Sequence, residues 1–192
     1  MSEIADLDGP HWKFALEIYS GEGVSEACLA LQDRFELDVI VLLIGLYGTV
    51  GQGKLAQSED IARMDAAICD WRRTVVHPLR AIRRHIKQSS YGEPVSRFRD
   101  VIKSTELRSE QIELAILAAQ IKDLPACAPG PVTSEHLSEL IVRTARVYTP
   151  TAEPAEIGRI ADPITKAAAA LASASTGQPS ASSKSVKERA RQ

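Results

Sequence analysis

The basic side chains between residues 71 and 87 form the pattern in this sequence that is most able to do chemistry. Six of them occur within 16 residues, and no acidic residue separates them. At about 100° per residue, all six fall on one side of a helix, and the apolar residues of the segment fall on another. Guanidinium groups bind carboxylates and phosphates through paired hydrogen bonds, so this face is typical of a surface for an anionic partner. The six residues are Arg72, Arg73, Arg80, Arg83, Arg84 and Lys87.

Two interpretations of this basic face stay open. It can be solvated or internally paired, since the net charge of −9 on residues 1–70 could neutralise the +7 on residues 71–109. It can instead bind a partner, because unpaired like charges three and four residues apart each cost a few tenths of a kcal/mol. An isoelectric point of about 6.1 and an aromatic content of 5% disfavour nucleic acid as that partner. We therefore expect a non-catalytic adaptor or regulator whose segment Arg72–Lys87 meets an anionic protein.

A second hypothesis is a pocket for a small ligand or an enzymatic reaction near Gln32, Asp33 and His77. Carboxylates and histidines perform acid–base chemistry when their pKa values are shifted. If Asp33 pairs with Arg80 or Arg84 instead, the cluster is structural. No residue is predicted to be catalytic, and no cofactor is expected. The four histidines have no partner at the spacing of metal ligands, so no metal site is expected either.

Two blocks of the sequence carry a family resemblance. The first contains W-K-F-A-L at 12–16, A-C-L-A-L-Q-D at 27–33 and D-V at 38–39, and the second contains W-R at 71–72, P-L-R at 78–80, R-R at 83–84 and K at 87. Together they resemble an uncharacterised bacterial family of all-helical proteins, a domain of unknown function, over residues 11–125. The chain departs from the family pattern at Ile40 and Tyr47, where Asn and Trp are expected. The resemblance implies a helical, cytoplasmic protein of bacterial origin and no established activity.

The elements that must position these residues are helices. Apolar residues recur at three- and four-residue spacing, and no strand pattern is convincing, so the sequence predicts an all-α fold, a compact orthogonal bundle of about six to seven helices. Residues 39–50 are apolar all round, which is typical of a buried central helix. Pro78 predicts a kink or a break, because it lacks a backbone N–H. The compact domain is expected over 8–149, a possible extra helix over 150–172 and a disordered tail over 173–192.

Composition and cysteine content indicate the compartment. The chain has 192 residues, of which 44% are hydrophobic and 25% charged, as in a typical globular domain. Its three cysteines include no C-x-x-C pair, and its first residues lack a signal-peptide pattern. The longest apolar run is about 12 residues, against about 20 for a membrane span. We therefore expect a cytoplasmic protein without a membrane span. No heptad seam indicates a particular oligomer.

Overall fold

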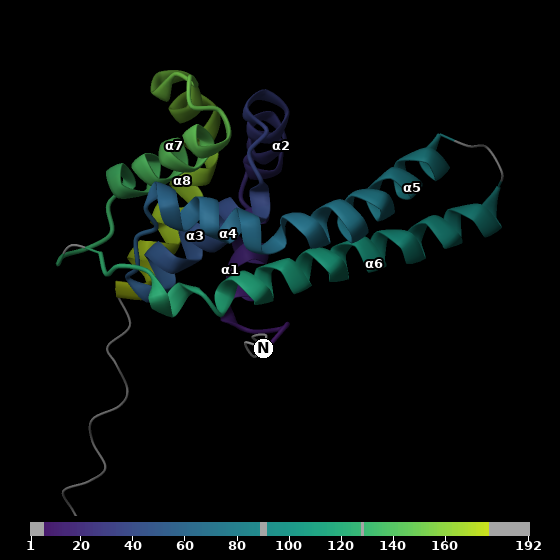
Figure 1. The fold of residues 1–192 in the computed structure, drawn as a ribbon, viewed down its shortest axis with the longest axis horizontal. Coiled ribbons are helices and arrows are strands. Elements are labelled where there is room, and N and C mark those ends of the chain that lie inside the picture. Colours follow the sequence, from purple (N-terminus) through teal and green to yellow (C-terminus); the bar gives the residue numbers. More distant parts are fainter. Residues whose placement is uncertain (1–5, 89–91, 128, 177–192) are drawn as a thin grey trace, which may run out of the picture.

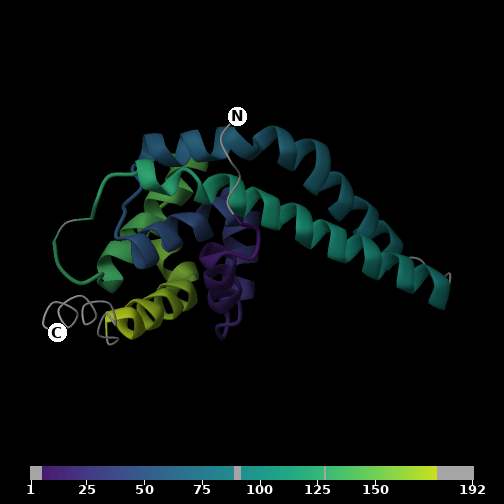
Figure 2. The same ribbon diagram turned by 90° about the horizontal axis from the view of Figure 1, so that it is seen from below.

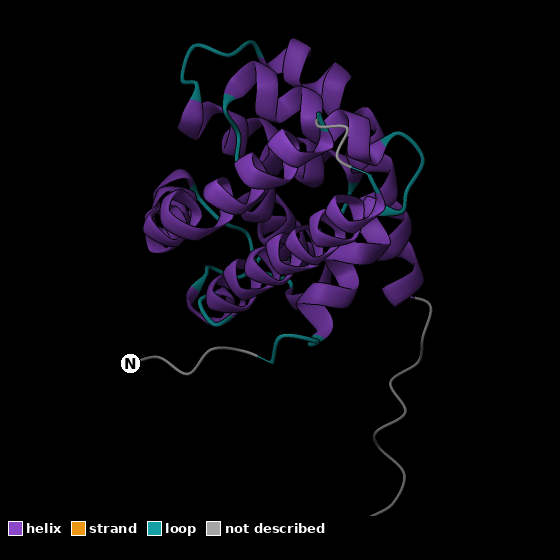
Figure 3. Cartoon of the chain, turned by 90° about the vertical axis from the view of Figure 1, so that its right-hand side faces the viewer, coloured by secondary structure: helices purple, strands orange, loops and turns teal. Residues whose placement is uncertain are grey.

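Helices make up most of the residues that the structure describes. The computed structural model describes residues 6–88, 92–127 and 129–176. Over these ranges the helices form seven rods, because α4, the π-helical turn η1 and α5 are continuous, and several of the rods cross one another (Figure 3). The predicted all-α fold is confirmed. The elements are α1 Pro10–Tyr19, α2 Val24–Phe35, α3 Val39–Gln52, α4 Ser58–Trp71, η1 Arg72–Val76, α5 His77–Lys87, α6 Glu93–Ala118, the short 3-10 helix η2 Ile121–Asp123, α7 Ser134–Tyr148 and α8 Pro154–Thr176.

Helix α3 lies at the centre of the helical body. Asp38 caps its N-terminus, because Val41 N–H donates to Asp38 Oδ1 at 3.0 Å. The nine residues from Val41 to Thr49 are all buried. A helix without a polar face must be covered on every side, and α1, α4, α6, α7 and α8 all pack against α3. The prediction of a buried central helix is thereby confirmed.

The rod from Ser58 to Lys87 passes Pro78 without ending. In a regular α-helix the proline ring would clash with the carbonyl group four residues earlier. Here the turn before it widens to π geometry, and His77 N–H bonds to the carbonyl of Arg72. Beyond Pro78, α5 packs along α6. Figures 1 and 2 show this helical hairpin projecting from the body; we call α5 and residues 93–105 of α6 the arm.

Helices α7 and α8 complete the body on the side away from the arm (Figure 1). Helix α8 packs against α2 and α7, and its residues Ile157, Ala161 and Ile164 belong to the core. The helix expected within 150–172 therefore forms part of the same body as residues 8–149, and it continues to Thr176. The rest of the expected tail, residues 177–192, lies outside the described residues. None of the helices in the described ranges combines the length and the apolar content needed to cross a membrane.

Candidate functional site

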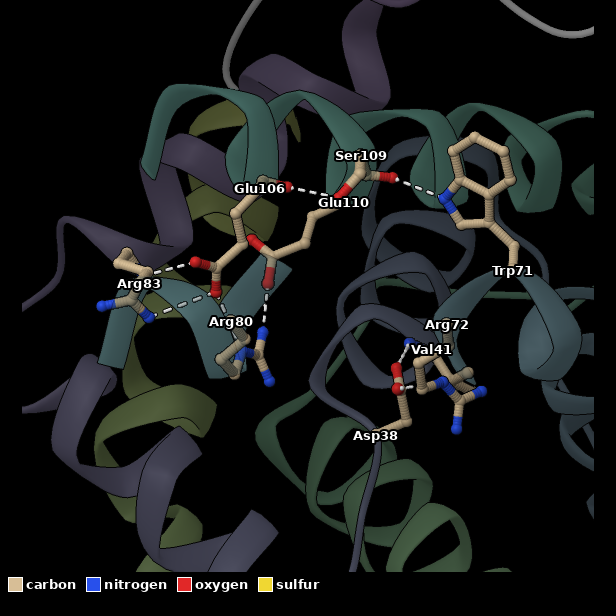
Figure 4. A network of polar contacts seen from close by, with 9 residues as sticks. All are labelled: Asp38, Val41, Trp71, Arg72, Arg80, Arg83, Glu106, Ser109 and Glu110. Carbon is tan, nitrogen blue, oxygen red and sulfur yellow. Dashed lines mark hydrogen bonds and ion pairs between the residues drawn. The ribbon is translucent and has the colours of Figure 1, made fainter. Parts of the chain in front are cut away.

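Arg72 is held in the body by two acids. Its Nε lies 2.9 Å from Asp38 Oδ2 and its Nη2 lies 2.6 Å from Asp65 Oδ1, and only 16% of its side chain is exposed. Figure 4 shows Arg72 and Asp38 facing each other where η1 passes the start of α3. Burial alone would lower the pKa of Arg72, but Asp38 and Asp65 raise it above its usual value. The charge of Arg72 is therefore already paired with acids of the same fold.

Arg80 and Arg83 join α5 to α6. Arg80 Nε donates to Glu106 Oε1 at 2.9 Å, and Arg80 Nη2 also donates to Glu110. Arg83 donates to both oxygens of Glu106, whose side chain is only 7% exposed (Figure 4). Burial raises the pKa of Glu106, but the hydrogen bonds from Arg83 and Arg80 outweigh it and bring the pKa below its usual value. Two more of the six cations are thus used within the fold.

The other three cations of the predicted basic face are exposed. Arg73 Nη2 lies 2.5 Å from Asp70, but both side chains are more than 70% exposed, so this pair is weak. Arg84 and Lys87 make no ion pair with any residue in the described ranges. The predicted face is therefore divided between cations that hold the fold together and cations that face solvent.

A cavity of about 390 Å³ lies between the base of the arm and the body. Helices α1, α2, α3, α5 and α6 and the turn η1 all contribute to its wall. Most of the wall is apolar, as is usual for ligand pockets of this size. Its apolar lining residues include Trp12, Leu16, Val39, Leu43, Val76 and Leu114.

The structure brings together two of the three residues proposed for a pocket. Gln32 and His77 line the cavity, whereas Asp33 does not. Asp33 is exposed and pairs with neither Arg80 nor Arg84, so the prediction of such a pair is wrong. Arg80 instead has its acids on α6, and Arg84 has no ion-pair partner within the described ranges. In this part of the chain, Asp38 is the acid that forms an ion pair with the basic segment, and its partner is Arg72.

Several ionisable groups in the cavity wall have pKa values shifted toward their uncharged forms, among them His77 and Glu113. Burial, Arg80 and Arg72 lower the pKa of His77 below its usual value, which favours the neutral imidazole. Burial and the neighbouring Asp38 raise the pKa of Glu113 to about 8. Glu113 is 1% exposed, and its Oε1 has no hydrogen-bond partner among the described residues. The cavity therefore holds a buried carboxyl group with unused hydrogen-bonding capacity.

The opening of the cavity combines apolar and basic side chains. Four lining residues, Leu16, Tyr19, Leu29 and Leu107, are 40–51% exposed. Arg84 and Lys103 also line the cavity and are exposed. Large apolar side chains exposed together around a concavity are typical of a binding site.

The sequence interpretation missed Glu106, Glu110 and Glu113. Their spacing of four and three residues places them on one face of α6, the face that also carries Leu107 and Leu114. Acidic residues at positions that an amphipathic helix normally gives to its apolar stripe are the signal that could have identified them.

Comparison with known proteins identifies one family. A family model described as "Protein of unknown function (DUF2390)" matches residues 10–117. This range contains every residue that lines the cavity. No curated protein matches the chain, and no solved structure does.

Proposed function

The chain belongs to the DUF2390 family of proteins of unknown function, and we propose that it is a binding protein whose cavity between the arm and the body holds a small ligand. The observation that supports this is the buried Glu113, which lines a mostly apolar cavity of about 390 Å³ and whose Oε1 has no hydrogen-bond partner in the described part of the chain. A pocket with mostly apolar walls and a few perturbed ionisable groups is the usual form of a ligand site. This is the hypothesis of a pocket near Gln32, Asp33 and His77, except that the acidic residue of the pocket is Glu113 instead of Asp33.

Binding suits this cavity better than catalysis. The charged groups Asp38, Arg72, Arg80 and Glu106 are engaged with one another in short contacts, and a general base must be able to reach the proton it removes. We place this activity in the cytoplasm of a bacterium, which agrees with the family resemblance and with the free thiols of Cys28, Cys69 and Cys127.

A fragment screen by ligand-observed NMR tests the proposal. Ala15 is 4% exposed and lines the cavity, so Ala15→Phe places a ring in the ligand's space. Ala66 is exposed on α4 and does not line the cavity, which makes Ala66→Phe the matched control. We expect fragments that bind the natural protein to bind Ala66→Phe equally and to lose at least tenfold in affinity for Ala15→Phe.

A second variant covers the case in which Ala15→Phe unfolds. Leu16 is half exposed at the opening, so Leu16→Trp narrows the entrance without overfilling the core. Its helical circular dichroism should match that of the natural protein. Fragments that bind all variants equally, or a screen without hits, would contradict a ligand site here.

The exposed cations of the arm favour a second function, contact with an anionic protein. Arg84 and Lys87 face solvent, and the arm also exposes Ile82, Phe98 and Val101 by 45–59%. An acidic partner with apolar side chains would match this surface better than nucleic acid, which the low aromatic content disfavours. A pull-down from nuclease-treated extract should recover a partner protein with the natural chain and with Arg73→Glu. It should not recover that partner with Arg84→Glu/Lys87→Glu. Equal recovery of the partner protein with both variants would contradict this second function.

A further inference from the structure

Glu113 is the acid in the cavity wall that forms no ion pair with any described residue. Its side chain lies on α6, one turn after Glu110, and is buried between the wall residues. Burying a carboxylate without a partner is costly, so such a group stays protonated or binds a cation. Its Oε1 is accessible to no solvent and accepts no hydrogen bond from the described residues.

Among the buried and partly buried charges that line the cavity, the acids outnumber the guanidinium groups by one. Three partly buried guanidinium groups, those of Arg72, Arg80 and Arg83, face acids in the wall and are already engaged by them. Those acids are Asp38, Glu106 and Glu110, and Glu113 is the fourth wall carboxyl. The other wall cations, Arg84 and Lys103, are exposed, where water screens them.

We infer that the cavity binds a ligand with an apolar body and a protonated amine, and that the amine pairs with the carboxylate of Glu113. This inference rests on the proposed function, because it names the ligand class for the same cavity. An ammonium group would supply the missing cation and the missing hydrogen-bond donor together. The apolar body would lie against Leu43, Leu114 and Trp12. A carboxylate ligand fits less well beside Glu113, because the partly buried guanidinium groups there already bind acids, whereas Arg84 and Lys103 are exposed.

Proton release is the signature of this pairing. The charged groups that act on Glu113 are Asp38 and Glu110, which raise its pKa, and Arg72 and Arg80, which lower it. Burial is the largest influence, and the resulting pKa of about 8 means that Glu113 is protonated in the empty protein at pH 7. An ammonium ligand requires the carboxylate, so binding at pH 7 should release close to one proton. Its affinity should rise about tenfold per pH unit up to about pH 7 and level off above pH 8.

The experiment compares three probes with one apolar body and different head groups. They are 2-phenylethylamine, 2-phenylethanol and 3-phenylpropanoate, titrated by calorimetry in two buffers of different ionisation enthalpy. We expect the amine to bind at least tenfold more tightly than the alcohol at pH 8 and to release a proton at pH 7. The carboxylate should bind most weakly of the three.

Glu113→Gln separates the inference from the proposed function. It keeps the shape of the side chain and removes its charge, so the alcohol should bind as before while the amine loses its advantage and its proton release. The exposed Glu93→Gln on the same helix should change nothing. If the alcohol binds and the amine binds no better, the inference is overturned and the ligand cavity stands. If none of the three probes binds, both are overturned.

Discussion

Asp38 and Arg72 join the two sequence blocks that carry the family resemblance. Arg72 Nε lies 2.9 Å from Asp38 Oδ2, while Asp38 Oδ1 accepts the hydrogen bond from Val41 N–H that begins α3. One carboxylate therefore caps the central helix and holds the turn η1 against it. Trp71, the neighbour of Arg72, attaches the same rod to α6, because its indole N–H donates to the carbonyl of Ser109 (Figure 4).

The two tasks of Asp38 can be separated by substitution. Asp38→Asn keeps an oxygen for the cap but loses the charge opposite Arg72, whereas Asp38→Ala loses both. We expect Asp38→Ala to lower the free energy of unfolding by about 3 kcal/mol, and Asp38→Asn by about 1 kcal/mol less than that. Urea denaturation of the three proteins measures this difference. Equal losses would show that the cap contributes nothing.

The ion pairs of Glu106 with Arg80 and Arg83, which we call the Glu106 cluster, should stabilise the arm far more than an exposed ion pair on the same helix. Glu106→Ala leaves Arg83 without an ion-pair partner in the described chain and Arg80 with Glu110 alone, so we expect a loss of about 3 kcal/mol. Glu93→Ala removes the pair with Arg97, whose side chains are 78% and 73% exposed, and should cost less than about 0.5 kcal/mol.

Hydrogen exchange locates this effect. The amides of α5 should exchange faster in Glu106→Ala, while those of α7 should change much less. Uniform acceleration over both helices would mean that the cluster stabilises the whole protein rather than the arm.

The helices were predictable because each depends on residues close together in the chain. Asp38 followed by an unbroken apolar run predicts a capped, buried helix, and α3 is that helix. The π turn was not predictable from local spacing. Pro78 indicates that the helix must adjust, but whether it breaks, kinks or widens depends on how the rod packs against α6.

The candidate site was predictable only in part, because its ion pairs span long stretches of sequence. The helical phase places Arg80 and Arg83 on one face, yet their acids, Glu106 and Glu110, come 23–30 residues later on α6. Only the pairing of α5 with α6 brings them together. Asp33 and Asp38 are five residues apart, but α2 presents Asp33 to solvent, whereas Asp38 begins α3 beside Arg72.

The buried Glu113 should make stability depend on pH in a defined direction. Its pKa is about 8 in the folded protein, because of burial and Asp38, against 4.5 for a free Glu. Between these values the folded state holds a proton that the unfolded state has released, so the contribution of Glu113 to stability falls as the pH rises. Glu113→Gln lacks this contribution. Its stability relative to the natural protein should therefore increase by roughly 3 kcal/mol from pH 5 to pH 8, since one pKa unit corresponds to about 1.4 kcal/mol.

Urea denaturation at several pH values measures this relative stability. Glu93→Gln, an exposed change on the same helix, should run parallel to the natural protein over the whole range. A constant difference between Glu113→Gln and the natural protein would show that Glu113 is ionised throughout.

Two glycines of α3 should respond in opposite directions to the same substitution. A Cβ at Gly45 would lie 3.6 Å from Leu140 Cδ2, an ordinary contact, so Gly45→Ala should stabilise by about 1 kcal/mol through helix propensity. A Cβ at Gly48 would lie 3.2 Å from Ile121 Cδ1, so the Ile121 side chain would have to move by a few tenths of an ångström. Overpacking of this kind costs about 1–3 kcal/mol, so Gly48→Ala should be neutral or destabilising. Thermal and urea unfolding of the two variants measure the difference, which should be at least about 1 kcal/mol. An equal gain from both substitutions would mean that the Ile121 side chain moves at little energetic cost. The close approach of α3 to Ile121 would then not explain the glycine at position 48.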